Sequence, residues 1–154
     1  MDALDREVLL ALQADGRMSN LALARSLELS PSAMLGRVRR LEAAGAIRGY
    51  RAIIDPAALG ITVRALVVAR LREHSERSIQ EFEQGIKLVP GVRACYHVTG
   101  QFDMVVELAL RDLDHLGQLI RVDIARIPGV MNLETMLIMA EPVEDDGWPL
   151  VPEK

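Results

Sequence analysis

The chain has 154 residues, half of them hydrophobic, and its 22 acidic residues outnumber 18 basic ones to give a net charge of −4. This composition supports a packed core and argues against a disordered chain. No apolar run reaches the roughly 18 residues of a membrane span, and the acidic N-terminus lacks the pattern of a secretory signal. We therefore expect a cytoplasmic protein of one domain, or of two small ones, with no membrane partner.

Positive charge is concentrated near the N-terminus. Residues 1–54 carry eight arginines against six acidic residues, a net of +2, which leaves −6 for residues 55–154. The guanidinium group matches both phosphate oxygens and guanine edges, so this third of the chain is the candidate nucleic-acid binder. Aromatic residues make up only 3% of the chain, which argues against base stacking and so against RNA or single strands.

Three helices are predicted in the basic third. Residues 3–14 repeat apolar side chains at helical spacing, and Asp2 can cap their first turn. Ser19 or Asn20 caps a short second helix, and Ser30 caps a third that runs from Pro31 to about Ala44. Residues 47–54 alternate weakly and predict a small hairpin. Residues 1–50 therefore predict a winged helix-turn-helix that binds double-stranded DNA.

The third helix has two different faces. On a 100° wheel Met34, Val38 and Leu41 face inward, while the opposite side carries small residues near the start and arginines beyond. Small side chains allow a close approach to base edges, and arginines reach phosphates or guanine. The hairpin adds two arginines where a wing would contact the backbone. The predicted DNA contacts are Ser30, Ser32, Ala33, Gly36, Arg37, Arg39, Arg40, Arg48 and Arg51. The alternative is a plain helical bundle with a solvated charged face.

The rest of the chain alternates strands and helices. Strands are predicted at 61–71, 92–98, 104–110 and 130–139, with helices at 79–89 and 113–127, and this order is that of a ferredoxin-like βαββαβ domain over 61–141. Residues 51–60 form a linker, and the acidic, proline-containing tail 142–154 is expected to be an extended arm or partly disordered. Strand 61–71 is apolar on much of both faces. Two helices cover only one face, so we expect a second subunit on the other.

The turn at 99–103 is the candidate ligand site. Gly100 can expose backbone N–H groups to a carboxylate, Thr99 adds a hydroxyl, and Asp103 could accept from an α-ammonium group. Together these groups suit a zwitterion. The alternative, favoured when the residues are taken alone, is an ordinary β-turn in which glycine and aspartate serve the backbone.

Neither a metal site nor a catalytic site is predicted. His74, His97 and His115 lack short metal-ligand spacing, and a single cysteine, Cys95, excludes an intrachain disulfide and predicts a small core residue. Cys95 and His97 would share a strand face, but no third group orients the histidine. We therefore expect no cofactor and no enzyme activity.

Several motifs resemble the Lrp/AsnC, or feast/famine, family of transcriptional regulators. In the first half these are Asp5-Arg6-x-Val8-Leu9, Gly16-Arg17-Met18-Ser19, Leu29-Ser30-Pro31-Ser32 and Arg37-Val38-Arg39-Arg40-Leu41-Glu42-x-x-Gly45-x-Ile47. In the second they are Gly91-Val92, Val98-Thr99-Gly100-Gln101-Phe102-Asp103 and Pro128-Gly129-Val130. Together they cover roughly residues 2–141.

The resemblance implies homodimers that share the linking strand and often assemble to octamers. It also implies an amino acid or related metabolite bound between dimers at Thr99, Gly100, Gln101, Phe102 and Asp103, and a nucleoid-associated location. Family members often carry an aromatic residue where this chain has Met104, which bears on the identity of the effector. The expected function is a DNA-binding regulator that responds to an amino acid. The alternatives are an architectural DNA-wrapping protein without an effector and a metabolite-binding module that regulates an enzyme.

Overall fold

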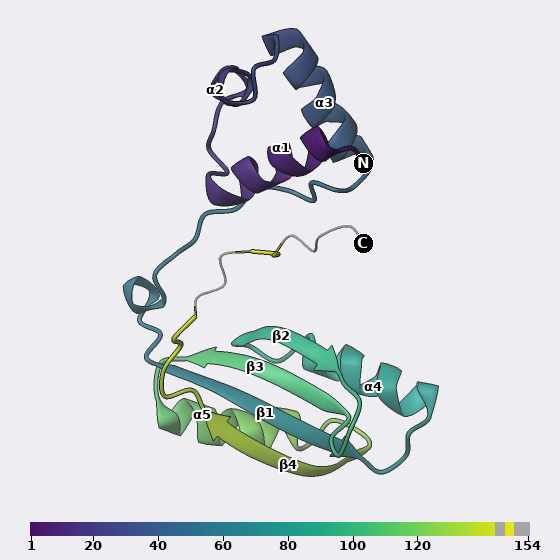
Figure 1. The fold of residues 1–154 in the computed structure, drawn as a ribbon. Helices are drawn as coiled ribbons and strands as arrows, with labels where there is room; N and C mark the ends of the chain where they lie inside the picture. The colour runs from purple at the N-terminus through teal and green to yellow at the C-terminus, as the bar shows by residue number, and fades with distance from the viewer. Residues whose placement is uncertain (144–146, 150–154) are drawn as a thin grey trace. The chain divides into compact units, whose positions relative to one another are not determined.

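The computed structural model describes residues 1–143 and 147–149. By their contacts the residues group into two compact units (Figure 1). The first comprises Met1–Ile53 together with Val143–Lys154, and the second comprises Ile54–Pro142. Among the described residues, no helix combines the length and the apolar character that crossing a membrane requires.

Three helices build the first unit: α1 (Ala3–Ala14), α2 (Asn20–Ser26) and α3 (Pro31–Ala43). Asp2, Ser19 and Ser30 cap them as predicted, because each side-chain oxygen accepts a backbone N–H of the first turn. The inward face predicted for α3 is confirmed. Its residues pack with α1 and α2 in a single core of Val8, Leu23, Ala24, Met34, Val38 and Leu41.

The hairpin predicted over residues 47–54 is wrong. The segment contains no strand, and Gly49 interrupts it with a φ of 149°. An isolated two-stranded hairpin is marginal in water, and this one would have had no third strand and no helix to cover it. Instead Ile47 packs against the helical core, and the hydroxyl of Tyr50 donates to Glu42 across 3.1 Å.

A short connection leads into the second unit. Pro56–Leu59 forms one turn of 3₁₀ helix, which Asp55 caps and which Gly60 ends with a left-handed φ of 72°. Glycine takes this conformation without the steric cost that a side chain would bring.

The second unit is one antiparallel sheet with two helices. Its strands are β1 (Val63–Leu71), β2 (Val92–His97), β3 (Met104–Leu110) and β4 (Val130–Leu137), in the order β2-β3-β1-β4. The helices are α4 (Glu76–Ile86) and α5 (Leu113–Leu119), and α5 continues as a π-helical turn over Ile120–Ile124. This arrangement confirms the ferredoxin-like prediction.

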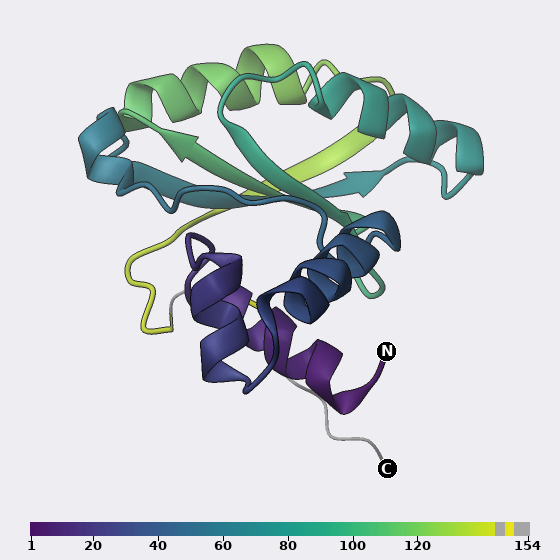
Figure 2. The same ribbon diagram turned by 90° about the horizontal axis from the view of Figure 1, so that it is seen from above.

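Both helices cover the same face of the sheet (Figure 2). Alternate residues of β1 from Ala65 to Leu71 are buried beneath them, and Phe82 of α4 is fully buried in the same core. Cys95 is half-buried against this core.

The opposite face of the sheet is part polar and part apolar. Arg64 forms ion pairs with Glu141 and with Glu107, the latter at 2.8 Å, and these acceptors raise the pKa of its guanidinium. Beside them Tyr96 and Met136 are about half exposed, at 54% and 47%. Within the unit no helix lies on this face (Figure 2).

The acidic arm expected at 142–154 falls largely outside the described residues. Within this range the structure describes residues 142, 143 and 147–149, and Trp148 contacts Gln13 of α1 in the first unit.

Candidate DNA-binding surface and effector loop

The start of α3 presents a smooth surface of small side chains. Ser30 is occupied as the helix cap, because its hydroxyl accepts the N–H of Ala33 at 3.3 Å and lies 3.3 Å from the hydroxyl of Ser32. Ser32, Ala33 and Gly36 are exposed, and a Cβ built on Gly36 would meet no atom within 4 Å. A flat polar partner can therefore approach the backbone of this turn closely.

Arg39 and Arg40 extend this surface along α3. Both are exposed, and the Arg40 side chain is 60% accessible although one nitrogen donates to Asp5 at 2.9 Å. The remaining donors of both guanidinium groups are available to a phosphate or a guanine edge.

Arg37 is less exposed than the other predicted DNA contacts. Only 18% of its side chain is exposed, and it donates to both carboxylate oxygens of Asp2, at 2.7 and 2.8 Å, and to Asp5. It therefore joins α3 to the start of α1. Sequence reasoning missed this link. The signal available for it is the pair of aspartates three residues apart at a helix start, where each can cap the other.

Asp5 is the centre of that link. Its side chain is 5% exposed and accepts the backbone N–H of Asp2 at 2.9 Å. This bond, with the hydrogen bonds from Arg37 and Arg40, outweighs burial and lowers the pKa of Asp5 from 3.8 to about 2. The carboxylate is thus charged at neutral pH and holds the position of α3.

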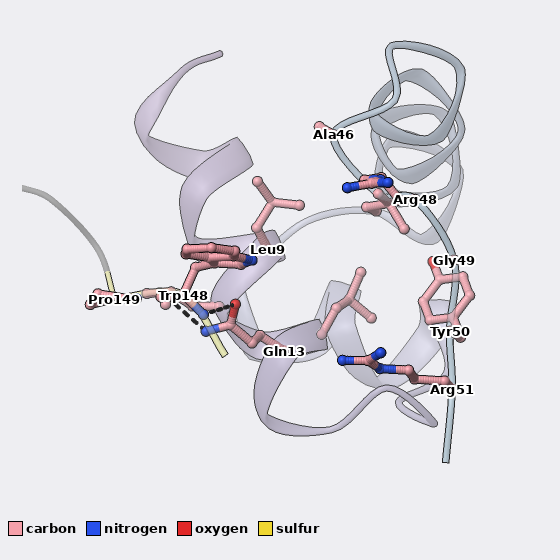
Figure 3. A pocket seen from close by; sticks show the side chains of 12 residues that line it. Leu9, Gln13, Ala46, Arg48, Gly49, Tyr50, Arg51, Trp148 and Pro149 are labelled. Atoms are coloured by element: carbon pink, nitrogen blue, oxygen red, sulfur yellow. Dashed lines mark hydrogen bonds between the residues drawn. The ribbon is translucent and has the colours of Figure 1, made fainter. Parts of the chain in front are cut away.

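Arg48 and Arg51 follow α3 on the segment that was expected to be a wing. Together with apolar residues of α1 and with Trp148 they line a pocket of about 740 Å³, which we call the α1 pocket (Figure 3). Across the described part of the chain, neither guanidinium forms an ion pair or a hydrogen bond.

The second candidate site is the loop between β2 and β3. It closes with a backbone bond from Val98 N–H to the carbonyl of Asp103 at 2.9 Å, and Asp103 N–H donates to Ala69 of β1 at 3.0 Å. Two nitrogens of Arg70 donate to the carbonyl of Gln101, at 2.9 and 2.7 Å. The second half of the loop, at Gln101 and Asp103, is therefore anchored to β1.

The Asp103 carboxylate belongs to this anchor. One oxygen accepts the buried N–H of Leu71 at 2.7 Å, and the other lies 2.7 Å from Nδ1 of His74. The residue is 8% exposed. Sequence reasoning missed both Arg70 and His74, because only the sheet register brings the end of β1 beside this loop.

The tip of the loop is open. Thr99, Gly100 and Gln101 are exposed, and Phe102 is half-buried. Gly100 has a φ of 120°, a conformation that L side chains rarely adopt, and no atom lies within 4 Å of a built Cβ. The tip thus offers a hydroxyl and accessible backbone to a small polar ligand.

Cys95 and His97 lie two residues apart on β2, and burial, with a smaller contribution from Glu83, raises the pKa of the Cys95 thiol. Such a thiol is a poor nucleophile. Over residues 1–143 and 147–149, no three His, Cys, Asp or Glu residues come together as metal ligands.

Known proteins match both units. Residues 1–48 match the family model described as winged helix-turn-helix DNA-binding, and residues 64–148 match that of the Lrp/AsnC ligand binding domain. The leucine-responsive regulatory proteins of Escherichia coli K12 and Klebsiella pneumoniae are each 33% identical over 141 residues, 92% of this chain and 86% of theirs.

Solved structures of transcriptional regulators also match this chain over most of its length. An AsnC-family transcriptional regulator from Agrobacterium tumefaciens has a TM-score of 0.90 at 26% identity, covering 97% of each chain. A Neisseria meningitidis transcriptional regulator in complex with L-Met has a TM-score of 0.88 at 25% identity, covering 94% of this chain and 93% of that one. With a helix-turn-helix matched at one end and a ligand-binding domain at the other, this chain belongs to the Lrp/AsnC family of DNA-binding transcriptional regulators.

Proposed function

We propose that the protein binds duplex DNA sequence-specifically through α3 and changes its DNA binding or assembly when an amino acid binds at the tip of the 99–103 loop. The observation that carries the first part is the exposed α3 surface. Ser32, Ala33 and Gly36 let the helix approach base edges, and Arg39 and Arg40 reach the backbone or a guanine. Arg37 acts as a positioning residue through Asp2 and Asp5.

Arg39→Ala tests the surface, with Arg77→Ala as a matched control. Arg77 is exposed on α4 in the second unit and pairs with Glu81 at 2.8 Å. Binding is measured against salt on fragments selected from the source genome. We expect Arg39→Ala to weaken affinity about tenfold and to lower the salt slope by about 1, as for a lost phosphate contact. Equal affinities for the two variants would overturn the assignment of α3.

The ligand class rests on the loop and on its relatives. Leucine appears in the names of two relatives, and L-Met is bound in one structural neighbour. Thr99 and the backbone around Gly100 suit the carboxylate of an amino acid. Because Asp103 is already bonded within the fold, we assign it the role of holding the loop.

A thermal-shift screen against the twenty amino acids tests this part. A ligand that binds only the folded protein raises the melting temperature with concentration. The expected hit should lose its effect in Thr99→Ala and keep it in Thr62→Ala, a threonine that directly precedes β1, at the opposite end of that strand from the loop. If no amino acid shifts the transition, the protein is better described as an architectural DNA-wrapping protein.

Self-association is proposed through the uncovered face of the sheet. Tyr96 and Met136 expose apolar surface there, and contiguous exposed apolar patches favour contact with another protein surface. We propose a homodimer that assembles further, up to an octamer, in a cytoplasmic, nucleoid-associated setting. Light scattering on Met136→Glu should show a smaller particle than the wild type, and an unchanged mass would contradict this interface.

A further inference from the structure

We infer that the α1 pocket is a second ligand site, built into the helix-turn-helix unit, that takes an amphipathic anion such as an aliphatic or aromatic carboxylate. The pocket lies within the first unit, between α1, the segment that follows α3 and the described residues Trp148 and Pro149 (Figure 3). Its volume of about 740 Å³ falls within the roughly 300–1,000 Å³ that is usual for a small-molecule site. No residue of the 99–103 loop lines it, so this site is separate from the proposed effector loop.

The floor of the pocket is apolar. Leu9 and Leu12 of α1 line it together with Ile47, and all three are only partly buried although they pack against the core of the unit. Leu10, also in the lining, is 37% exposed. Apolar surface that is open to water in a concave site gains free energy when an apolar ligand covers it. The pocket therefore favours a ligand with an apolar body.

Arg48 and Arg51 supply the charge of the site. Both side chains reach from the segment after α3 toward the side of the pocket that carries Leu9 and Trp148 (Figure 3). Both are exposed, and neither forms an ion pair or a hydrogen bond with another residue that the structure describes. The described lining residues include these two arginines and no aspartate or glutamate, a net charge of +2. An anionic head group would therefore meet two guanidinium groups with free donors.

Trp148 forms the opposite wall of the pocket and is held there through its main chain. The side-chain amide of Gln13 donates to the carbonyl of Trp148 and accepts its N–H, both at 2.9 Å (Figure 3). Gly147, with a φ of +104°, lies so close that a Cβ there would overlap the side chain of Gln13. Trp148 is nevertheless 86% exposed, so its ring is positioned without being covered. It can pack against the apolar body of a ligand.

The fluorescence of Trp148 tests the site directly, because this is the chain's single tryptophan and it lines the pocket. The probe is octanoate. Two controls divide its chemistry, since 1-octanol has the chain without the charge and sulfate has the charge without the chain. We expect octanoate to change the emission saturably, with a midpoint at least about tenfold lower than that of either control. Calorimetry on the same samples measures binding whether or not the indole responds.

The combined variant Arg48→Gln, Arg51→Gln should weaken octanoate binding at least about tenfold. Both side chains are exposed and unpaired, so the unit should still fold. Arg77→Gln, at an exposed position on α4, is the matched control and should bind as the wild type does. Equal midpoints for octanoate and 1-octanol, or for octanoate and sulfate, would overturn the inference. Equal affinity in the combined variant, or no saturable binding in either measurement, would also overturn it.

A ligand in the α1 pocket would also act on DNA binding, because Arg48 and Arg51 are among the predicted DNA contacts. This consequence rests on the proposed function, whereas the ligand site does not. Saturating octanoate should weaken DNA binding by the wild type about threefold to tenfold at about 50 mM salt and leave the combined variant unaffected. Octanoate that binds without changing DNA affinity would refute this coupling. Failure of the wild type to bind DNA would refute the proposed function, and the octanoate result would still stand or fall separately.

Discussion

Replacing Asp103 by alanine separates two roles for this residue, a direct contact with the effector and an anchor for the loop. In the structure the carboxylate accepts the N–H of Leu71 at 2.7 Å in a site where Leu71 is 2% exposed. A hydrogen bond to a charged group contributes about 1.5–3 kcal/mol, and a buried donor left without an acceptor costs about 1–3 kcal/mol. These two energies are estimates for the loss of the same hydrogen bond and are not added together. We therefore expect Asp103→Ala to lower the free energy of unfolding by about 2–3 kcal/mol.

Asp103→Asn is the informative companion variant. The amide oxygen of the asparagine can still accept the N–H of Leu71, although the pairing with His74 is weakened. The free energy of unfolding of this variant should therefore fall by less, about 1 kcal/mol. Asp114→Ala, an exposed position on α5, controls for the loss of a carboxylate. Urea unfolding followed by circular dichroism gives the midpoints, and equal slopes across the variants would show that the same surface is exposed on unfolding.

One result would refute the anchor. If Asp103→Ala unfolded at the wild-type midpoint and yet lost the response to amino acids, the carboxylate would contact the effector directly, as the family resemblance implies. Loss of both stability and response, with partial recovery of both in Asp103→Asn, is the outcome that the geometry predicts.

Three further predictions concern single sites. Gly36→Ala should stabilise the first unit by about 0.5–1 kcal/mol in thermal unfolding, because glycine is a poor helix former, but should weaken DNA binding in a filter or anisotropy assay by blocking close approach. Asp5 stabilises the fold fully above its unfolded pKa of about 3.8, and this contribution is lost as the pH falls toward its folded pKa of about 2. Asp5→Asn should therefore flatten the acid limb of the stability curve between those values. Cys95, whose pKa burial raises, should react with a thiol-disulfide reagent at pH 8 more slowly in the native protein than in urea, and equal rates would contradict its half-buried position.

Much of the architecture followed from local patterns. The caps at Asp2, Ser19 and Ser30 and the inward face of α3 needed only helical spacing and short side chains that accept N–H groups. The βαββαβ order needed only the change of period and the Pro-Gly pairs that end each helix region. These signals act between residues a few positions apart, so a sequence displays them directly.

The failures have a common physical origin. Residues 47–54 alternate only weakly, and a pair of strands needs a surface to cover it; Ile47 packs in the helical core instead. Arg37 has the same residue type and nearly the same position as Arg39. What distinguishes them is Asp2 and Asp5, more than thirty residues away in the chain.

The sequence by itself determined the caps of the first three helices, the inward face of α3 and the βαββαβ order of the elements that follow. Only the tertiary structure decided that Asp103 is tied to Leu71 and His74, that Arg37 serves α1, and that Trp148 is seated on Gln13. Each of these depends on hydrogen bonds between residues far apart in the chain. Such partners are chosen by the packing of whole elements, which no local pattern encodes.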